Sequence, residues 1–182
     1  MATTHSTDRS LRSLLADRVL QPLRRTPTAA DLPWILLIVP YGLVALVLAI
    51  TGGIVEPSWP DYWEYLLVPP ALLVFPSLIE ESIFRGLLLP PDLSEASPQR
   101  QLAAVLASTA VFVAWHPLNH FLIGISDTSV FVDPTFLVIV TLLGLTCAVQ
   151  YLKTRSLWLP VLTHWATVLI WNLFLGRDFT AG

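Results

Sequence analysis

Charged residues are scarce in this sequence of 182 residues. Only 13% of the chain is charged, about half the proportion usual in soluble domains, whereas 54% is hydrophobic and the mean hydropathy is +0.67. This composition excludes a water-soluble globule and a disordered chain. The net charge of −3 provides no basic face, so we expect no nucleic-acid partner.

Cysteine and cofactor motifs are scarce as well. Cys147 is the single cysteine, which excludes a disulfide framework and a zinc site built from cysteines, and we expect it to be a small core residue. There is no glycine-rich phosphate loop and no dinucleotide fingerprint, so we expect no soluble cofactor. Proline, in contrast, is abundant, with 15 residues against eight glycines, and predicts kinked helices.

Long uncharged stretches predict membrane spans. Residues 32–55, 101–126, 134–152 and 156–176 contain no Asp, Glu, Lys or Arg. Each stretch can cross a hydrocarbon core roughly 30 Å thick at about 1.5 Å per helical residue. We expect a fifth span over 65–89, although charged residues interrupt it. The predicted fold class is all-α: a polytopic integral membrane helical bundle with about five transmembrane helices.

The first 31 residues are polar and basic, without the apolar stretch of a cleaved signal peptide. Leucine and valine recur there at helical spacing between arginines, which predicts an amphipathic helix in contact with membrane lipid; a partly ordered tail is the alternative. We therefore expect a cytoplasmic tail over 1–31 and a membrane domain over 32–182.

Basic residues mark every second connection between the predicted spans. The N-terminal tail, the loop at Arg100 and the loop at Lys153 and Arg155 would share one face of the membrane, and acidic loops would share the other. The positive-inside rule then places the N-terminus in the cytoplasm and the C-terminus outside. We expect an integral protein of a bacterial cytoplasmic membrane.

Three charged residues at membrane depth give the first indication of function. A mid-span charge costs about 2.5–3.5 kcal/mol on insertion scales, so Glu80, Glu81 and Arg85 are expected to face a polar interior rather than lipid. Glu81 and Arg85 share a helix face and should pair. Glu80, about 100° away around the helix, is left for chemistry. The alternative is a Glu–Arg brace that only fixes helix packing.

Three histidines also lie in apolar segments: His116, His120 and His164. Together with the glutamates they indicate a site bordered by several helices rather than isolated interhelical hydrogen bonds. Pro117 disfavours α conformation at His116, so we expect the helix to break or kink there and the two nearer histidines not to align as a metal pair. His120 is expected to be structural, and Trp115 to be a packing residue.

The order of these residues resembles the CPBP family of intramembrane proteases, which includes the type II CAAX prenyl endopeptidases and the bacteriocin self-immunity (Abi) proteins. The first motif of that family, EExxxR, matches Glu80, Glu81 and Arg85. The second, FxxxH, matches Phe112 and His116. The resemblance covers roughly residues 69–175, a little over half of the chain.

The third motif of the family, a histidine in the final helix followed four residues later by Asn or Asp, matches only in part. His164 fits, but the later position is Val168, so the expected amide donor is absent. Asn172 is two turns beyond His164, roughly 12 Å along the axis, and is too far to act on the same oxyanion. Thr167 and Asn119 are alternative donors.

The resemblance implies an intramembrane endopeptidase that acts on a membrane-tethered peptide or protein. Glu80 and His116 would hold and deprotonate a water molecule, and His164 would donate a hydrogen bond to the developing oxyanion. The other motif residues would orient these groups: Glu81, Arg85 and Phe112.

Three alternatives remain open. A zinc-dependent form of the protease would use His116, His164 and a glutamate as metal ligands. The missing amide and the small number of spans favour a non-catalytic scaffold, an immunity factor or an assembly subunit with partner subunits in a larger membrane complex. The buried acids and histidines also suit a proton or ion pathway, although five spans without an internal repeat are few for a transporter.

Overall fold

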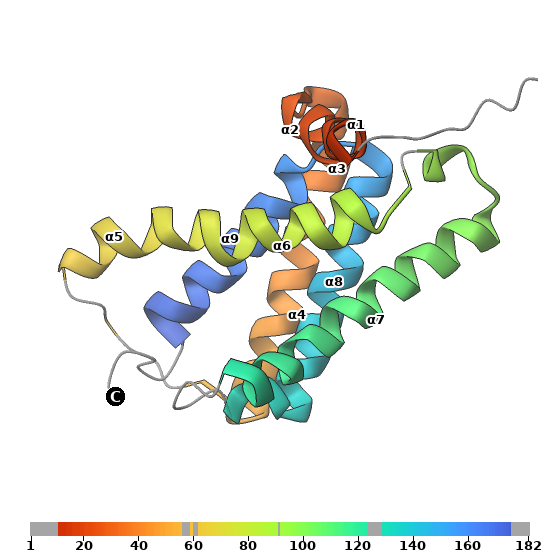
Figure 1. Ribbon diagram of the computed structural model, residues 1–182. Helices are drawn as coiled ribbons and strands as arrows, with labels where there is room; N and C mark the ends of the chain where they lie inside the picture. Colours follow the sequence, from red (N-terminus) through yellow and green to blue (C-terminus); the bar gives the residue numbers. More distant parts are fainter. Residues whose placement is uncertain (1–10, 56–58, 60–61, 91, 124–128, 176–182) are drawn as a thin grey trace, which may run out of the picture.

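Helices make up nearly all of the structure (Figure 1). The computed structural model describes residues 11–55, 59, 62–90, 92–123 and 129–175, and none of these residues lies in a strand. The predicted all-α class is therefore confirmed.

Five helical stretches have the length and hydropathy of membrane spans, in agreement with the predicted number. They cover Ala29–Thr51, Trp63–Leu87, Pro98–Leu122, Pro134–Thr154 and Trp158–Leu175. Large apolar side chains are exposed on the outside of these stretches, among them Leu43, Leu67 and Phe121. Such a surface is unfavourable in water and matches a bilayer interior, so the chain is an integral membrane protein.

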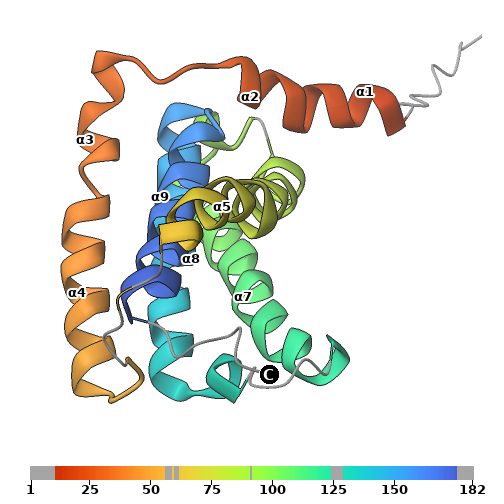
Figure 2. The ribbon, with the colours of Figure 1, turned by 90° about the vertical axis from the view of Figure 1, so that its left-hand side faces the viewer.

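The N-terminal helices lie across one end of the bundle (Figure 2). They consist of α1 (Leu11–Leu15), a π-helical turn (Ala16–Leu20) and α2 (Gln21–Arg24). Arg18 Nη1 donates to the carbonyl oxygen of Leu89 at 3.1 Å, and the indole N–H of Trp158 donates to the carbonyl oxygen of Leu23 at 2.7 Å. Long-range hydrogen bonds thus fix this segment to the membrane domain.

The first span stands along one side of the bundle (Figure 2). It consists of α3 (Leu32–Ile35) and α4 (Ile38–Thr51). A capping box precedes it, in which the backbone N–H of Thr28 donates to Asp31 Oδ2 at 2.8 Å. α4 packs along α8 (Pro134–Thr154), and this contact buries Tyr41.

The second span crosses the bundle and changes its helical form along its length (Figure 1). It consists of α5 (Tyr62–Leu72), a π-helical stretch (Leu73–Leu78), α6 (Ile79–Glu81) and a second π-helical stretch (Ser82–Leu87). Phe75 leaves the helical region, with φ −128° and ψ 123°, because Pro76 disfavours α conformation in the residue before it. Glu80 and Glu81 lie beyond this point in α6, and Arg85 lies in the second π-helical stretch.

The third span is α7 (Pro98–Ile123), and the helix break expected at His116 is absent. The expectation was wrong because the helix continues through Pro117. Proline removes one backbone hydrogen bond, but packed neighbours in a membrane bundle tolerate this loss. His116 and His120 therefore lie one turn apart on a continuous helix.

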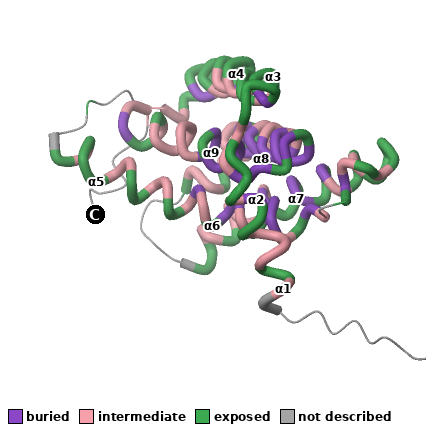
Figure 3. Tube along the Cα trace, turned by 90° about the horizontal axis from the view of Figure 1, so that it is seen from above, coloured by how far each residue is buried: buried purple, intermediate pink, exposed green. Residues whose placement is uncertain are grey.

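α8 is the central helix, and Figure 3 shows buried positions along much of its length. Asp133 begins it by accepting hydrogen bonds from the backbone N–H groups of Thr135 and Phe136, at 2.7 and 3.2 Å. Arg155, in the left-handed region at φ 53°, ends it. The last span consists of α9 (Trp158–Ile170) and a π-helical turn (Trp171–Leu175).

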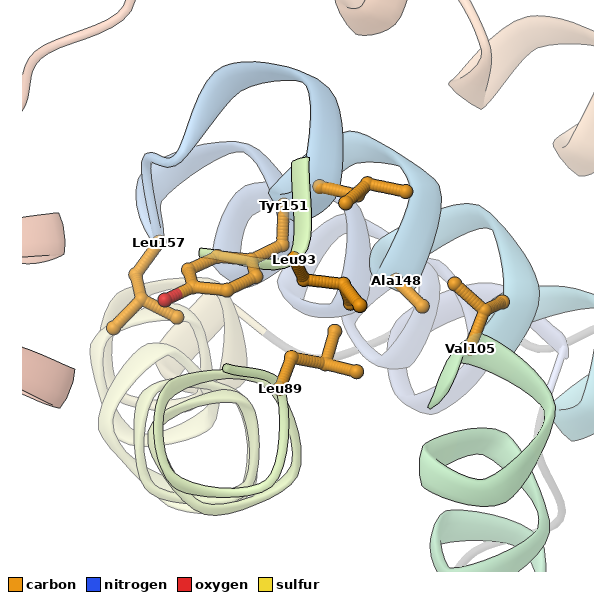
Figure 4. Packing of buried hydrophobic residues seen from close by; sticks show 7 residues of the cluster. Leu89, Leu93, Val105, Ala148, Tyr151 and Leu157 are labelled. Atoms are coloured by element: carbon orange, nitrogen blue, oxygen red, sulfur yellow. The ribbon is translucent and has the colours of Figure 1, made fainter. Parts of the chain in front are cut away.

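Two apolar clusters hold the bundle together. The first (Figure 4) packs against Val19 and Leu23 of the N-terminal segment and contains Leu89, Leu93, Val105, Ala148, Tyr151, Leu152 and Leu157. The second contains Tyr41, Phe84, Phe112, Val140, Leu143 and Cys147. Cys147 is fully buried, which confirms its predicted place in the core.

Candidate active site

Glu81 and Arg85 form an ion pair without exposed surface. Arg85 Nη1 lies 3.0 Å from Glu81 Oε1, so the predicted pairing is confirmed. Arg85 Nη2 donates to the carbonyl oxygen of Gly144 at 3.0 Å, and the guanidinium carbon lies 4.4 Å from the centre of the Phe112 ring. Gly144 permits this approach, because a Cβ there would lie 3.2 Å from the Phe112 ring and 2.9 Å from Thr109.

The same carboxylate oxygen of Glu81 also binds His164, from the last span. His164 Nδ1 lies 2.9 Å from Glu81 Oε1, and the imidazole is 2% exposed. A carboxylate accepts hydrogen bonds, so Nδ1 carries the proton. In the neutral ring, Nε2 then has a free lone pair and accepts hydrogen bonds. It becomes a donor only when the ring is protonated.

Glu80 is bound through one of its two oxygens. Glu80 Oε1 accepts a hydrogen bond from the indole N–H of Trp115 at 3.1 Å, whereas Oε2 is buried and has no partner among the described residues. Trp115, which was expected to be a packing residue, is therefore a hydrogen-bond donor to the site, a contact that the sequence did not predict. The available signal was its position beside His116 at membrane depth, where a buried indole N–H needs an acceptor.

His116 is held by its own helix. Its Nδ1 lies 2.9 Å from the carbonyl oxygen of Phe112, which can only accept, so Nδ1 carries the proton and Nε2 is an acceptor in the neutral ring. Phe112 lies edge-on to both imidazoles, with centroid distances of 4.9 Å to His116 and 5.7 Å to His164. Phe112 therefore packs between the two histidines of the site and helps to fix both rings.

A cavity of about 360 Å³ brings the predicted residues together. Glu80, His116 and His164 all line it. The further polar lining residues are Tyr41, Asn119, Thr167 and Asn172. The apolar wall is formed by Leu72, Phe75, Pro76, Phe131, Phe136, Ile139, Val140, Leu143, Val168 and Trp171. A largely apolar cavity with a few convergent polar groups is typical of a ligand site.

His120 does not belong to the residues that line this cavity. Its ring lies edge-on to Phe121, with a centroid distance of 5.0 Å. Although it lies one turn beyond His116 on the same helix, the structure does not bring it to the glutamates. The structural role expected for His120 stays a prediction.

Position 168, where the resembled family has an amide, contributes an apolar side chain to the cavity wall. The nearby polar groups are engaged with backbone: the Thr167 hydroxyl donates to the carbonyl oxygen of Thr163, and the Asn172 amide donates to that of Val168, both at 2.8 Å. Asn119 lines the cavity from α7. Position 168 itself therefore provides no amide donor to the site.

The arrangement does not fit a zinc centre. Within the described ranges, no group of three or more His, Cys, Asp or Glu side chains is placed to hold one metal ion. His116 and His164 each hold Nδ1 in a hydrogen bond and leave Nε2 free, as zinc-bound histidines do, but no third ligand is placed with them in the described ranges. A catalytic zinc needs three protein ligands, which these residues do not offer as a group.

Comparison with known proteins gives one match. A family model described as type II CAAX prenyl endopeptidase Rce1-like matches residues 62–170, from the start of α5 to the end of α9. No curated protein matches the chain, and no solved structure does. The matched region contains Glu80, His116 and His164, whereas the first span lies outside it.

Proposed function

The chain belongs to the type II CAAX prenyl endopeptidase Rce1-like family, and we propose on this basis that it is an intramembrane endopeptidase. It hydrolyses a peptide bond of a membrane-associated protein or peptide. The observation that carries the proposal is the unpartnered Oε2 of Glu80, in the wall of a cavity that His116 and His164 also line.

Glu80 acts as the general base. Its Oε2 takes one proton from a water molecule, the Nε2 of His116 accepts a hydrogen bond from the remaining O–H, and the water oxygen attacks the carbonyl carbon. The C=O electron pair moves onto the carbonyl oxygen and forms a tetrahedral oxyanion. This pair restores the carbonyl when the C–N bond breaks, and the proton on Glu80 passes to the leaving nitrogen.

The buried groups around Glu80 position the reacting ones. The hydrogen bond from Trp115 fixes Oε1 of Glu80, so that Oε2 is the basic atom. The Glu81–Arg85 pair holds Nδ1 of His164 and directs its other nitrogen away from the pair. Because Nδ1 of His164 already donates to Glu81, Nε2 can donate to the oxyanion only as part of an imidazolium.

The test is peptide cleavage by the purified chain in lipid nanodiscs. Membrane-anchored peptides, with and without a C-terminal prenyl group, are incubated with wild type and variants, and products are identified by mass spectrometry. E80Q and H116A should lower kcat by about 10²–10⁴-fold. E95Q is the matched control, since Glu95 is an exposed carboxylate paired with Arg155 outside the cavity. Cleavage by E80Q at the wild-type rate would refute the proposal.

Val168 favours a second function, that of a non-catalytic scaffold, immunity factor or assembly subunit, because the amide donor of the family is missing. In that case the buried network serves packing alone. Partner subunits captured equally by wild type and E80Q, with no peptide cleaved by either, would favour this second function over the protease.

We also propose a bacterial cytoplasmic membrane as the location, with the N-terminus in the cytoplasm and the C-terminus outside. Supporting this orientation, Arg18 and Arg155 lie at the same end of the bundle, where Arg18 bonds to Leu89 and Arg155 to Ser94. Reporter fusions at both termini test the orientation. Activity of a cytoplasm-specific reporter at the C-terminus would contradict it.

A further inference from the structure

The proposed reaction needs a hydrogen-bond donor for the oxyanion. The carboxylate of Glu80 and the neutral imidazoles of His116 and His164 do not supply one to the cavity. A developing oxyanion requires donors aimed at it. Glu80 accepts through Oε2, and the neutral rings of His116 and His164 accept through Nε2, since Nδ1 of each is the donor in a bond to protein. Position 168 offers only the apolar side chain of Val168.

Tyr41, on α4, has the missing chemistry. It is 7% exposed, packs with Phe112 and Leu143 in the second apolar cluster, and lines the same cavity as Glu80. Its hydroxyl is buried and has no described partner at good hydrogen-bond geometry, although the Thr167 side chain lies close to it. A phenol has one O–H donor, and leaving such a group unpaired in an apolar interior is unfavourable.

The position of Tyr41 relates it to the missing amide. Its hydroxyl lies beside Thr167, the residue before Val168 on α9, and both residues line the cavity. Thr167 donates its own proton to a backbone carbonyl, so its hydroxyl can only accept from Tyr41, and a negative substrate oxygen is the stronger acceptor for the phenol O–H. Because Tyr41 precedes the region matched by the family, the family motif does not assign it a role.

We propose that the Tyr41 hydroxyl donates the hydrogen bond to the oxyanion that an amide at position 168 supplies in the family. This proposal rests on the proposed endopeptidase function. The phenol keeps its proton throughout: it donates while the carbonyl oxygen is negative, and the bond weakens when the C–N bond breaks and the carbonyl is restored.

The test compares kcat of Y41F, which keeps the ring and removes the donor, with that of Y151F. Tyr151 is also buried, but it belongs to the first cluster and does not line this cavity. Y41F should lower kcat by about 10²–10³-fold, as expected for loss of one oxyanion donor, with KM changed little. Y151F should cleave at the wild-type rate.

Rescue separates a catalytic role from a structural one. V168N restores the amide of the family. The kcat of Y41F/V168N should therefore be at least tenfold higher than that of Y41F. An unchanged kcat in Y41F, or a loss that V168N does not repair, overturns the proposal for Tyr41. So does a loss of kcat in N119A in place of Y41F, because Asn119 would then be the donor. If Tyr41 proves not to be the donor but E80Q is inactive, only the proposal for Tyr41 fails and the endopeptidase function stands. If E80Q retains full activity, both proposals fail.

Discussion

Replacing Arg85 by methionine should destabilise the membrane domain far more than loss of an exposed ion pair such as Arg155–Glu95. Met keeps much of the aliphatic stem but removes the donors to Glu81 and to the carbonyl oxygen of Gly144, each at 3.0 Å. It also removes the cation from the Phe112 ring, 4.4 Å away. Breaking a fully buried pair by removing one partner costs about 3–5 kcal/mol, because the other charge is left without its counter-ion.

A double variant identifies the origin of this cost. In E81Q/R85M neither charge remains, so the double variant should be more stable than the sum of the two single losses predicts, by about 1–3 kcal/mol. R155M is the matched control. Arg155 and Glu95 lie 2.9 Å apart but are 45% and 78% exposed, and such surface pairs contribute about 0–1 kcal/mol.

The assay is reversible unfolding of the purified protein in mixed detergent and SDS, followed by tryptophan fluorescence. R85M should lose several kcal/mol of the free energy of unfolding, whereas R155M should lose at most about 1 kcal/mol. If R85M and R155M differ by less than about 0.5 kcal/mol, the burial of the Glu81–Arg85 pair does not have the energetic weight assigned to it.

Three further changes test other contacts of the structure. W115F keeps an aromatic ring but frees Oε1 of Glu80, so kcat should fall by up to about 100-fold while the free energy of unfolding changes little; equal kcat would contradict a positioning role. G144A places a Cβ 2.9 Å from its nearest neighbour and should cost about 1–3 kcal/mol in SDS unfolding, whereas G42A, which meets nothing within 4 Å, should be near neutral. R18M removes a charge-assisted hydrogen bond worth about 1.5–3 kcal/mol, so proteinase K should cleave the N-terminal helices at least tenfold faster, and an unchanged rate would show that they are held by other contacts.

Local features of the site could be predicted from the sequence because they depend on spacing along one helix. The four-residue interval between Glu81 and Arg85 fixes a shared face, and the structure has the pair at 3.0 Å. The same argument left Glu80 outside the pair, and its Oε2 has no partner among the residues described. Uncharged intervals likewise predicted five spans, since span length follows from membrane thickness.

Contacts between distant segments could not be predicted in this way. His164 and Glu81 are 83 residues apart, and Trp115 and Glu80 are 35 apart, so no helical period relates the members of either pair. The helix break expected beside Pro117 is absent, because there a local preference is outweighed by packing. A local rule was applied where packing of the surrounding helix decides the conformation.

The charge balance of the site explains why Glu80, rather than Glu81, has to react. Oε1 of Glu81 accepts from both Arg85 and His164, so neutralising this carboxylate would leave the buried Arg85 without its counter-ion. Glu80 accepts from the neutral indole of Trp115 alone and keeps one oxygen for the cavity. A proton taken up at that oxygen costs no contact and removes a buried charge. The carboxylate that is paired with Arg85 therefore positions the site, and the one that lines the cavity without a cation beside it carries the proton during the reaction.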